Sequence, residues 1–196
     1  MTTGDHREML DGAEVFTFAD AGAWESWLAG AHERADGAWL RIAKKGSGRT
    51  TITLAAAAEI GLCYGWIDSQ RKTYDADHYL QRYSPRRPAS SWSRVNVDKA
   101  EALIAAGRMR APGFAVIAAA KADGRWDAAY ASQRTATVPP DLAAALAADV
   151  RAREHFDRLD RTRQYALLLR LMKARTADAR AGQLRQIVAS LIPSGR

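Results

Sequence analysis

The chain has 196 residues, of which 47% are hydrophobic and 26% charged, the composition of a soluble globular protein. A chain of this length buries enough apolar surface to fold without disulfides or a structural metal. Its single cysteine excludes an internal disulfide framework and a cysteine-rich zinc or iron–sulfur site. The four histidines are scattered and show no paired metal-ligand spacing, so we expect no metal site.

The formal net charge of +7 is unevenly distributed along the chain. Residues 1–40 carry two basic and eight acidic side chains, whereas residues 41–94 carry ten basic and four acidic ones. Residues 151–196 are also basic, but their arginines alternate with acids and fall on several helical faces, which is typical of a solvated surface. The charge of residues 41–94 therefore indicates a local anion site. A nucleic-acid partner is the less favoured interpretation.

The predicted elements follow from hydrophobic periodicity and from turn and capping residues. In chain order they are a strand at 14–20, a helix at 22–35, a strand at 38–45, a helix at 53–64 with Thr53 as N-cap, a β-hairpin at 66–87 with its turn at 75–77, and helices at 97–106 (Asn96 as N-cap), 112–123 and about 141–148. Two or three further helices are expected between residues 152 and 192.

This order predicts an α+β fold, with a small, mostly antiparallel sheet and helices in the N-terminal half and an all-helical C-terminal half. We expect a mixed lobe over residues 1–95 that carries a basic, aromatic hairpin and loop. A helical lobe over 96–196 is expected to pack on it within one compact domain. The first residues lack the pattern of a secretory signal, and no apolar run is long enough to span a membrane. The predicted location is the cytoplasm.

Common cofactor motifs are absent: there is no phosphate-binding loop, no dinucleotide fingerprint and no nucleophile elbow. We therefore predict no cofactor. Cys63 lies near the predicted C-terminal end of a helix, where the dipole disfavours a thiolate, and a buried structural role is the favoured interpretation.

Basic, aromatic and small polar side chains are concentrated between residues 39 and 96. Guanidinium and ammonium groups beside indole rings suit an anionic ligand with a flat or apolar part. The ligand-binding candidates are Trp39, Lys45, Trp66, Arg86, Arg87, Trp92, Ser93 and Asn96. If chemistry occurs, Asp68 is the candidate base and Lys44 the candidate electrostatic stabiliser. The alternatives are a solvated basic strand face with core tryptophans, and an Asp68 that pairs with Arg71 or Arg86.

Four strings carry a family resemblance: AWLRIAKKGSG, ITLAAAAEIGLCYGWIDSQRK, YLQRYSPRRPASSWSRVN and LIAAGRM. Together they resemble the YdeI/OmpD-associated family, also called the bacteriocin-protection family, over about residues 24–190. The resemblance implies a bacterial protein linked to stress resistance and to tolerance of antimicrobial peptides. It implies no general reaction.

Two functions from different classes follow from these observations. The first is a pocket that binds an anionic small molecule and that, if chemistry occurs, is also the catalytic site. The second is a protein-interaction module in antimicrobial-peptide resistance, in which the tryptophans form the core and a protein is the partner.

Overall fold

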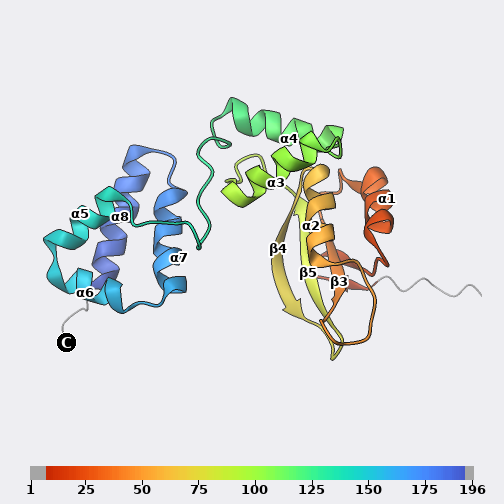
Figure 1. Cartoon of the computed structure of the whole chain (residues 1–196), viewed down its shortest axis with the longest axis horizontal. Coiled ribbons are helices and arrows are strands. Elements are labelled where there is room, and N and C mark those ends of the chain that lie inside the picture. Colours follow the sequence, from red (N-terminus) through yellow and green to blue (C-terminus); the bar gives the residue numbers. More distant parts are fainter. Residues whose placement is uncertain (1–7, 193–196) are drawn as a thin grey trace, which may run out of the picture. The chain divides into compact units, whose positions relative to one another are not determined.

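The computed structural model describes residues 8–192, which divide between two compact units (Figure 1). The first unit comprises the residues up to Ser90 together with Asn96–Asp127. The second comprises Ser91–Val95 and the residues from Ala128 onward.

The first unit contains one five-stranded sheet. Its strands are β1 (Met9–Leu10), β2 (Ala13–Phe16), β3 (Ala38–Ala43), β4 (Trp66–Thr73) and β5 (His78–Pro85). They lie in the order β1-β2-β3-β5-β4, and β2 and β3 are parallel whereas the other neighbours are antiparallel. The predicted α+β fold with a mostly antiparallel sheet is confirmed. The two-residue strand β1 was not predicted, because two residues show no periodicity.

Four helices accompany this sheet. They are α1 (Ala21–Ala31), α2 (Leu54–Cys63), α3 (Arg94–Ala105) and α4 (Ala111–Ala122). The predicted cap of α2 is confirmed, because the Thr53 hydroxyl accepts a hydrogen bond from the Ala56 amide at 3.2 Å. The predicted cap of α3 is wrong. That helix begins at Arg94, so Asn96 lies inside its first turn.

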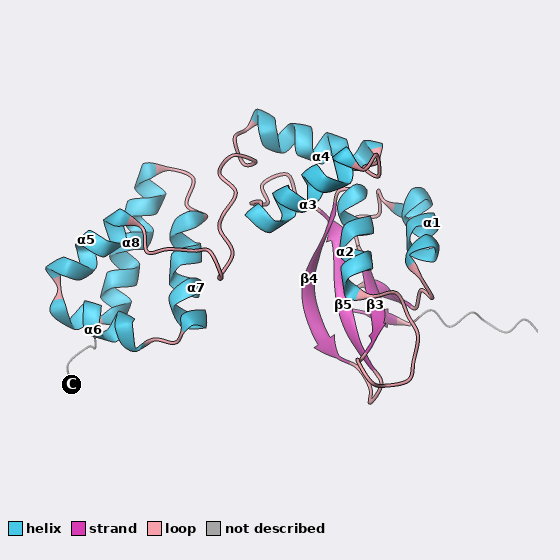
Figure 2. Ribbon diagram, viewed as in Figure 1, coloured by secondary structure: helices cyan, strands magenta, loops and turns pink. Residues whose placement is uncertain are grey.

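The two faces of the sheet differ in what covers them. Side chains alternate along a strand, and directly paired residues share a face. Tyr83 marks the helix-covered face, since its ring lies 5.8 Å from that of Trp24 on α1 and a Cβ at Gly61 on α2 would touch it. Figure 2 shows α1 and α2 side by side along the sheet. The opposite face holds a smaller buried cluster of Ala13, Trp39 and Leu80.

Gly65 joins α2 to β4 in a conformation that other residues rarely adopt. Its φ is +73°, in the left-handed region. A Cβ at this position would lie 2.8 Å from a methyl carbon of Val116 and 3.1 Å from the Pro112 carbonyl oxygen. The backbone oxygen of Gly65 also accepts the Arg86 amide at 2.9 Å. Glycine therefore lets α4 approach closely where β4 begins.

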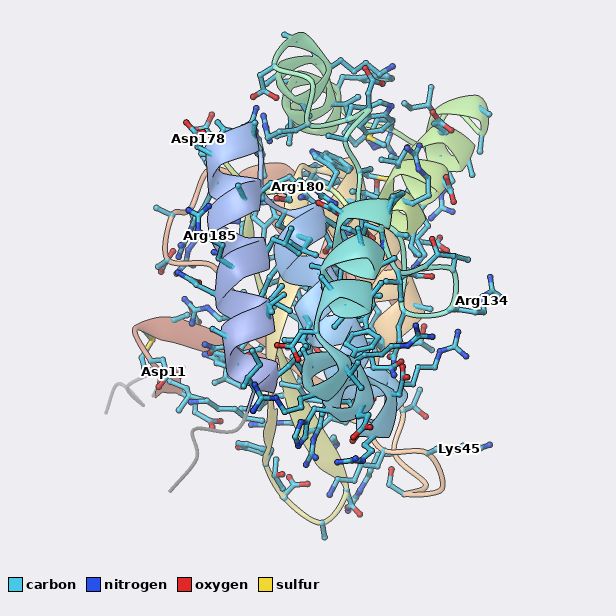
Figure 3. All side chains as sticks on the ribbon, turned by 90° about the vertical axis from the view of Figure 1, so that its left-hand side faces the viewer. Asp11, Lys45, Arg134, Asp178, Arg180 and Arg185 are labelled. Atoms are coloured by element: carbon cyan, nitrogen blue, oxygen red, sulfur yellow. The ribbon has the colours of Figure 1, made fainter. Side chains whose placement is uncertain are left out.

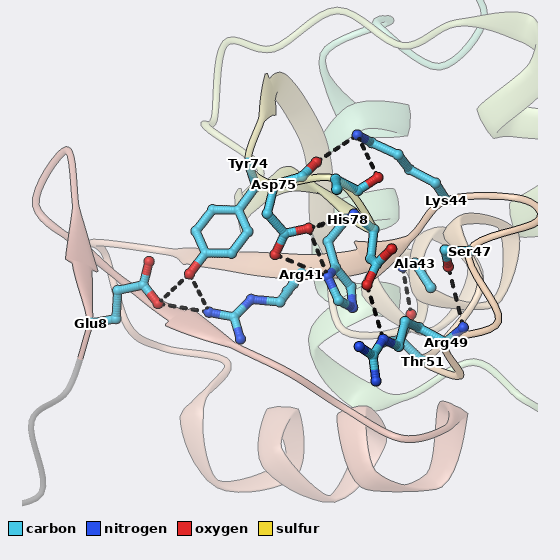
Figure 4. A network of polar contacts seen from close by, with 12 residues as sticks. Glu8, Arg41, Ala43, Lys44, Ser47, Arg49, Thr51, Tyr74, Asp75 and His78 are labelled. Carbon is cyan, nitrogen blue, oxygen red and sulfur yellow. Dashed lines mark hydrogen bonds and ion pairs between the residues drawn. The ribbon is translucent and has the colours of Figure 1, made fainter.

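The hairpin between β4 and β5 is closed by its own side chains. One Asp75 carboxylate oxygen accepts the amides of Asp77 and His78 at 2.8 and 2.6 Å. The Lys44 ammonium donates to the main-chain oxygens of Asp75 and Ala76 at 2.6 and 3.2 Å (Figure 4). This turn, predicted from Asp75-Ala76-Asp77, is confirmed, and Lys44 caps it.

The second unit is helical. Its helices are α5 (Pro140–Ala148), α6 (Val150–Arg158), α7 (Arg161–Met172) and α8 (Ala177–Leu191). They bury a core of aliphatic and aromatic side chains: Leu142, Leu146, Ala152, Phe156, Leu168, Leu171, Ile187 and Leu191. Arg180 extends from α8 (Figure 3). It binds both carboxylate oxygens of Asp141 on α5 at 2.7 and 2.9 Å. A third bond runs from Arg180 to the Leu171 carbonyl at 3.0 Å, so this side chain joins α5, α7 and α8.

Candidate functional site

A cavity of about 600 Å³ lies in the first unit, beside the first half of β4 and the last half of β5. We call it the arginine groove. Its lining residues are Ala35, Ile67, Ser69, Gln70, Arg82, Ser84, Pro85, Arg86, Arg87, Pro88 and Ser90. Three of these are cationic, four carry a neutral polar side chain and none is acidic. The groove therefore offers many donors to an anion and no carboxylate that would repel it.

Strand geometry explains why these side chains converge. Arg82 and Ser84 lie two residues apart on β5, and Ser84 pairs with Ile67 of β4, so all three share the face opposite α2. Arg86 follows β5 at the same two-residue spacing.

A β-bulge on β4 adds Ser69 and Gln70 to the groove. The pairing shifts register between Asp68 and Arg71, which leaves these two residues outside the regular ladder. The buried side chain of Gln81 donates to their main-chain oxygens at 3.4 and 3.1 Å. A buried amide on β5 thus stabilises the bulge from the other side of the sheet.

The loop that carries two of the arginines is fixed by hydrogen bonds. Arg86 is only 6% exposed, and its amide is bound to the Gly65 carbonyl. Arg125 is 4% exposed and donates to the Ser90 carbonyl at 3.0 Å, while its Nε pairs with the Asp123 carboxylate at 2.7 Å. The buried Arg125 guanidinium thus holds Ser90 near the C-terminal end of α4, and the Arg86 amide is fixed at Gly65, which limits the ordering that a ligand must impose.

Arg82 keeps its charge available to the groove. Its guanidinium donates to the main-chain oxygen of Asp36 at 2.8 Å, whereas the Asp36 carboxylate pairs with Arg34 at 2.8 Å. The hydrogen bond from Arg34 is the main reason that the pKa of Asp36 lies below its usual value, and the charge of Arg82 contributes less.

Three other predicted site residues lie in a different cavity, on the helix-covered side of β4. This cavity, of about 500 Å³, is lined by Leu54, Ala55, Ala58, Leu62, Trp66, Ile67, Asp68, Asn96 and Lys99. We call it the α2 cavity. Trp66 and Asp68 alternate with Ile67 along β4, so they face α2 while Ser84 and Arg82 face the groove. Ile67, on the edge strand, lines both cavities.

The remaining candidates are dispersed. Lys44 and Lys45 line a third cavity of about 530 Å³ beside the 46–53 loop, and Lys45 projects away from that loop (Figure 3). Trp39 is fully buried, donates its indole N–H to the Leu10 carbonyl at 2.9 Å and lines none of these three cavities.

Trp92 and Ser93 belong to the second unit. Trp92 is 1% exposed and its carbonyl accepts the Tyr130 amide at 3.0 Å, while Ser93 forms a parallel bridge with Tyr130. The predicted catalytic pair is also separated, since Asp68 and Lys44 line different cavities. Among the described residues, Asp68 forms no ion pair with Arg71, whose Nε donates instead to Gln81 at 3.2 Å.

Sequence reasoning missed Arg82, Ser84, Ser69 and Gln70 in the groove and Lys99 in the α2 cavity. The alternation of Arg82, Ser84 and Arg86 along a predicted strand was a usable signal for one shared face. The bulge had no such signal, because it depends on the pairing of β4 with β5.

Cys63 is buried at the end of α2, as its position in the sequence indicated. Burial raises the pKa of its thiol, and the nearby Arg108 offsets this only in part. Its favoured structural role agrees with this environment.

Residues 8–192 contain no group of three or more His, Cys, Asp or Glu side chains placed to hold a metal ion. None of the helices described is both long enough and apolar enough to cross a membrane.

Two family models match different parts of the chain. The first, described as Domain of unknown function (DUF8412), matches residues 16–116, which is more than half of the chain. The chain belongs to this family. The second, described as Bacteriocin-protection, YdeI or OmpD-Associated, matches residues 135–192 and supports the family predicted from the sequence.

The two matched ranges have different structural content. The DUF8412 range contains the strands β3 to β5 and the two cavities beside β4, whereas the YdeI/OmpD-associated range contains α5 to α8 and the Asp141–Arg180 pair. The central strings of the resemblance thus lie within the DUF8412 range. No curated protein and no solved structure matches the chain.

Proposed function

We propose that this protein binds an anionic small molecule, a phosphate or carboxylate compound, in the arginine groove. The observation that carries the proposal is the lining itself, with three arginines, four neutral polar side chains and no acid. A guanidinium presents several N–H groups in one plane, which matches the oxygens of phosphate and carboxylate groups. A cavity of about 600 Å³ is within the size range of small-molecule sites.

The proposal is for binding and includes no reaction. Asp68, the candidate base, faces α2 from the opposite side of β4, and Lys44 is engaged at the hairpin turn. Neither side chain lines the groove. We therefore replace the predicted base and stabiliser with a binding role for Arg82, Arg86 and Arg87.

The test is calorimetric titration with inorganic phosphate and pyrophosphate. Arg87 is exposed, so Arg87→Gln removes a charge without disturbing the core. We expect about tenfold weaker pyrophosphate binding for Arg87→Gln and roughly a hundredfold for Arg82→Gln combined with Arg87→Gln, since each bond to a charged group contributes about 1.5–3 kcal/mol. Arg108→Gln is the matched control, because Arg108 is half exposed, pairs with Glu59 and does not line the groove.

Binding that is unchanged in the double variant would refute the groove as the site. A single-stranded oligonucleotide is titrated in parallel at several salt concentrations. If it binds more tightly than pyrophosphate, with a steep loss of affinity as salt rises, the ligand is a nucleic-acid backbone instead of a small molecule.

For the cellular role, we propose resistance to bacteriocin-type peptides, in line with the family description for residues 135–192. The proposed location, the bacterial cytoplasm, rests on the sequence alone. The experiment compares survival under such a peptide for bacteria that express the wild-type chain, the double arginine variant, or neither. Loss of protection in the double variant supports a role through the bound anion. Full protection by that variant favours the alternative, a protein-interaction module.

A further inference from the structure

The α2 cavity has a lining of a different kind from the arginine groove. Its floor is apolar, formed by Leu54, Ala55, Ala58 and Leu62 from α2 with Trp66 and Ile67 from β4. Its polar lining consists of one carboxylate, one amide and one ammonium, those of Asp68, Asn96 and Lys99. All nine residues belong to the first unit.

The side chains that form the apolar floor of the α2 cavity are held in fixed positions. Leu54, Ala58 and Leu62 recur at four-residue spacing, so they share one face of α2. The small side chain of Ala58 leaves the space open between the two leucines. Trp66 is held in place because its indole N–H donates to the His32 carbonyl at 2.7 Å and its ring packs edge-on against Trp24 at 6.0 Å.

Two opposite charges line this cavity without pairing. Asp68 and Lys99 are both exposed, and within residues 8–192 neither takes part in an ion pair or a side-chain hydrogen bond. Most other acids of this unit are engaged, as in the pairs Glu25–Arg110 and Glu59–Arg108. A carboxylate and an ammonium that line one cavity and leave each other unpaired can each receive a ligand group of the opposite charge.

The direction of the Asp68 side chain is supported by its neighbour across the sheet. Asp68 pairs with Tyr83, whose hydroxyl donates to the Leu54 carbonyl at 3.5 Å. Burial raises the pKa of Tyr83, and the Asp68 charge raises it further. The carboxylate therefore acts on the side of β4 that Leu54 and α2 cover, which is the side of the cavity.

We propose that the α2 cavity binds a small zwitterion with an apolar body, such as a free apolar amino acid. The ammonium group of the ligand binds Asp68, its carboxylate binds Lys99, and its apolar part lies against Ala58, Leu62 and Trp66. Asn96 supplies an amide that both donates and accepts hydrogen bonds. This site is separate from the arginine groove, and the proposal for it does not depend on the function proposed for the groove.

The ligand series tests the charge requirement directly. L-phenylalanine carries both charges and an apolar ring, 2-phenylethylamine lacks the carboxylate, 3-phenylpropionate lacks the ammonium and L-serine lacks the ring. We expect saturable binding of L-phenylalanine by titration calorimetry, and binding about tenfold weaker or worse for each of the other three. Absence of L-phenylalanine binding, or equal affinity for a compound that lacks one charge, would overturn the proposal.

Variants then assign each charge to its partner. Asp68→Asn is expected to weaken the binding of 2-phenylethylamine and L-phenylalanine about five- to tenfold and to leave the binding of 3-phenylpropionate unchanged. Lys99→Gln is expected to weaken the binding of 3-phenylpropionate and to leave the binding of 2-phenylethylamine unchanged. Ala58→Leu fills the cavity and should abolish binding of all three compounds. Wild-type affinities in Asp68→Asn and Lys99→Gln would show that the ligand binds elsewhere.

The controls separate this site from general effects of charge and from the groove. Asp98→Asn removes an exposed acid next to Lys99 that does not line the cavity, and Lys45→Gln removes an exposed lysine directly before the 46–53 loop. Both should bind L-phenylalanine like the wild type. Asp68→Asn should retain pyrophosphate binding and Arg87→Gln should retain L-phenylalanine binding, so each site can fail without the other.

Discussion

The Asp141–Arg180 pair is expected to stabilise the second unit measurably. Arg180→Met removes two charge-assisted hydrogen bonds of 2.7 and 2.9 Å and a third bond of 3.0 Å to the Leu171 carbonyl. Both side chains are 34% exposed, so each bond contributes much less to the free energy of unfolding than the same bond would contribute in a buried site. We expect a loss of about 2 kcal/mol for Arg180→Met, about 1 kcal/mol for Asp141→Asn and a coupling energy of about 1 kcal/mol between them.

The same pair sets a pH dependence with a definite sign. The hydrogen bond from Arg180 holds the pKa of Asp141 below its usual value in the folded protein. The stabilisation is therefore complete above the pKa of the unfolded aspartate, about 3.9, and is lost as the pH falls through the lower folded pKa. The wild type should therefore lose this stabilisation in acid. Asp141→Asn lacks the carboxylate, so its stability should show no such loss.

The assay is hydrogen exchange of peptides from α5 and α8 in increasing urea, because it reports on the second unit separately. Arg185→Met on α8 is the matched control, since Arg185 is exposed and makes no interaction that the described residues show. Equal unfolding free energies for Arg180→Met and Arg185→Met, or a coupling energy near zero, would refute the structural role of the pair.

Two further predictions concern the first unit. Gly65→Ala combines a φ of +73° with a Cβ 2.8 Å from Val116, and it should lower the unfolding free energy by about 2–3 kcal/mol in urea titrations. Gly48→Ala has a φ of +72° but no atom within 4 Å of the new Cβ, so it should cost only about 1 kcal/mol, and equal costs would contradict the packing argument. Burial raises the pKa of the Cys63 thiol, so a disulfide reagent at pH 8 should label it only in denaturant. Labelling of the native protein at the rate of a free thiol would show that the site opens without unfolding.

Much of the fold could be predicted because its signals are local. Thr53 caps α2 through its own side chain, and Asp75 closes the hairpin turn through amides two and three residues away. The helix containing Asn96 was predicted, but its first residue was wrong. Helix starts depend on which amides find partners outside the helix, and the Arg94 amide finds the carbonyl of Tyr130, far along the chain.

The sequence alone determined the α+β class, the hairpin and the concentration of cations and tryptophans between residues 39 and 96. Only the tertiary structure decided how those side chains are divided. Neighbours on a strand point to opposite faces, so Asp68 lines a cavity with α2 while Ile67 and Ser69 reach the arginine groove. Proximity along the chain carries no information about what covers each face. The helix α2 and the 86–90 segment lie beside β4 through contacts between distant residues, and buried Arg125 holds that segment at Ser90.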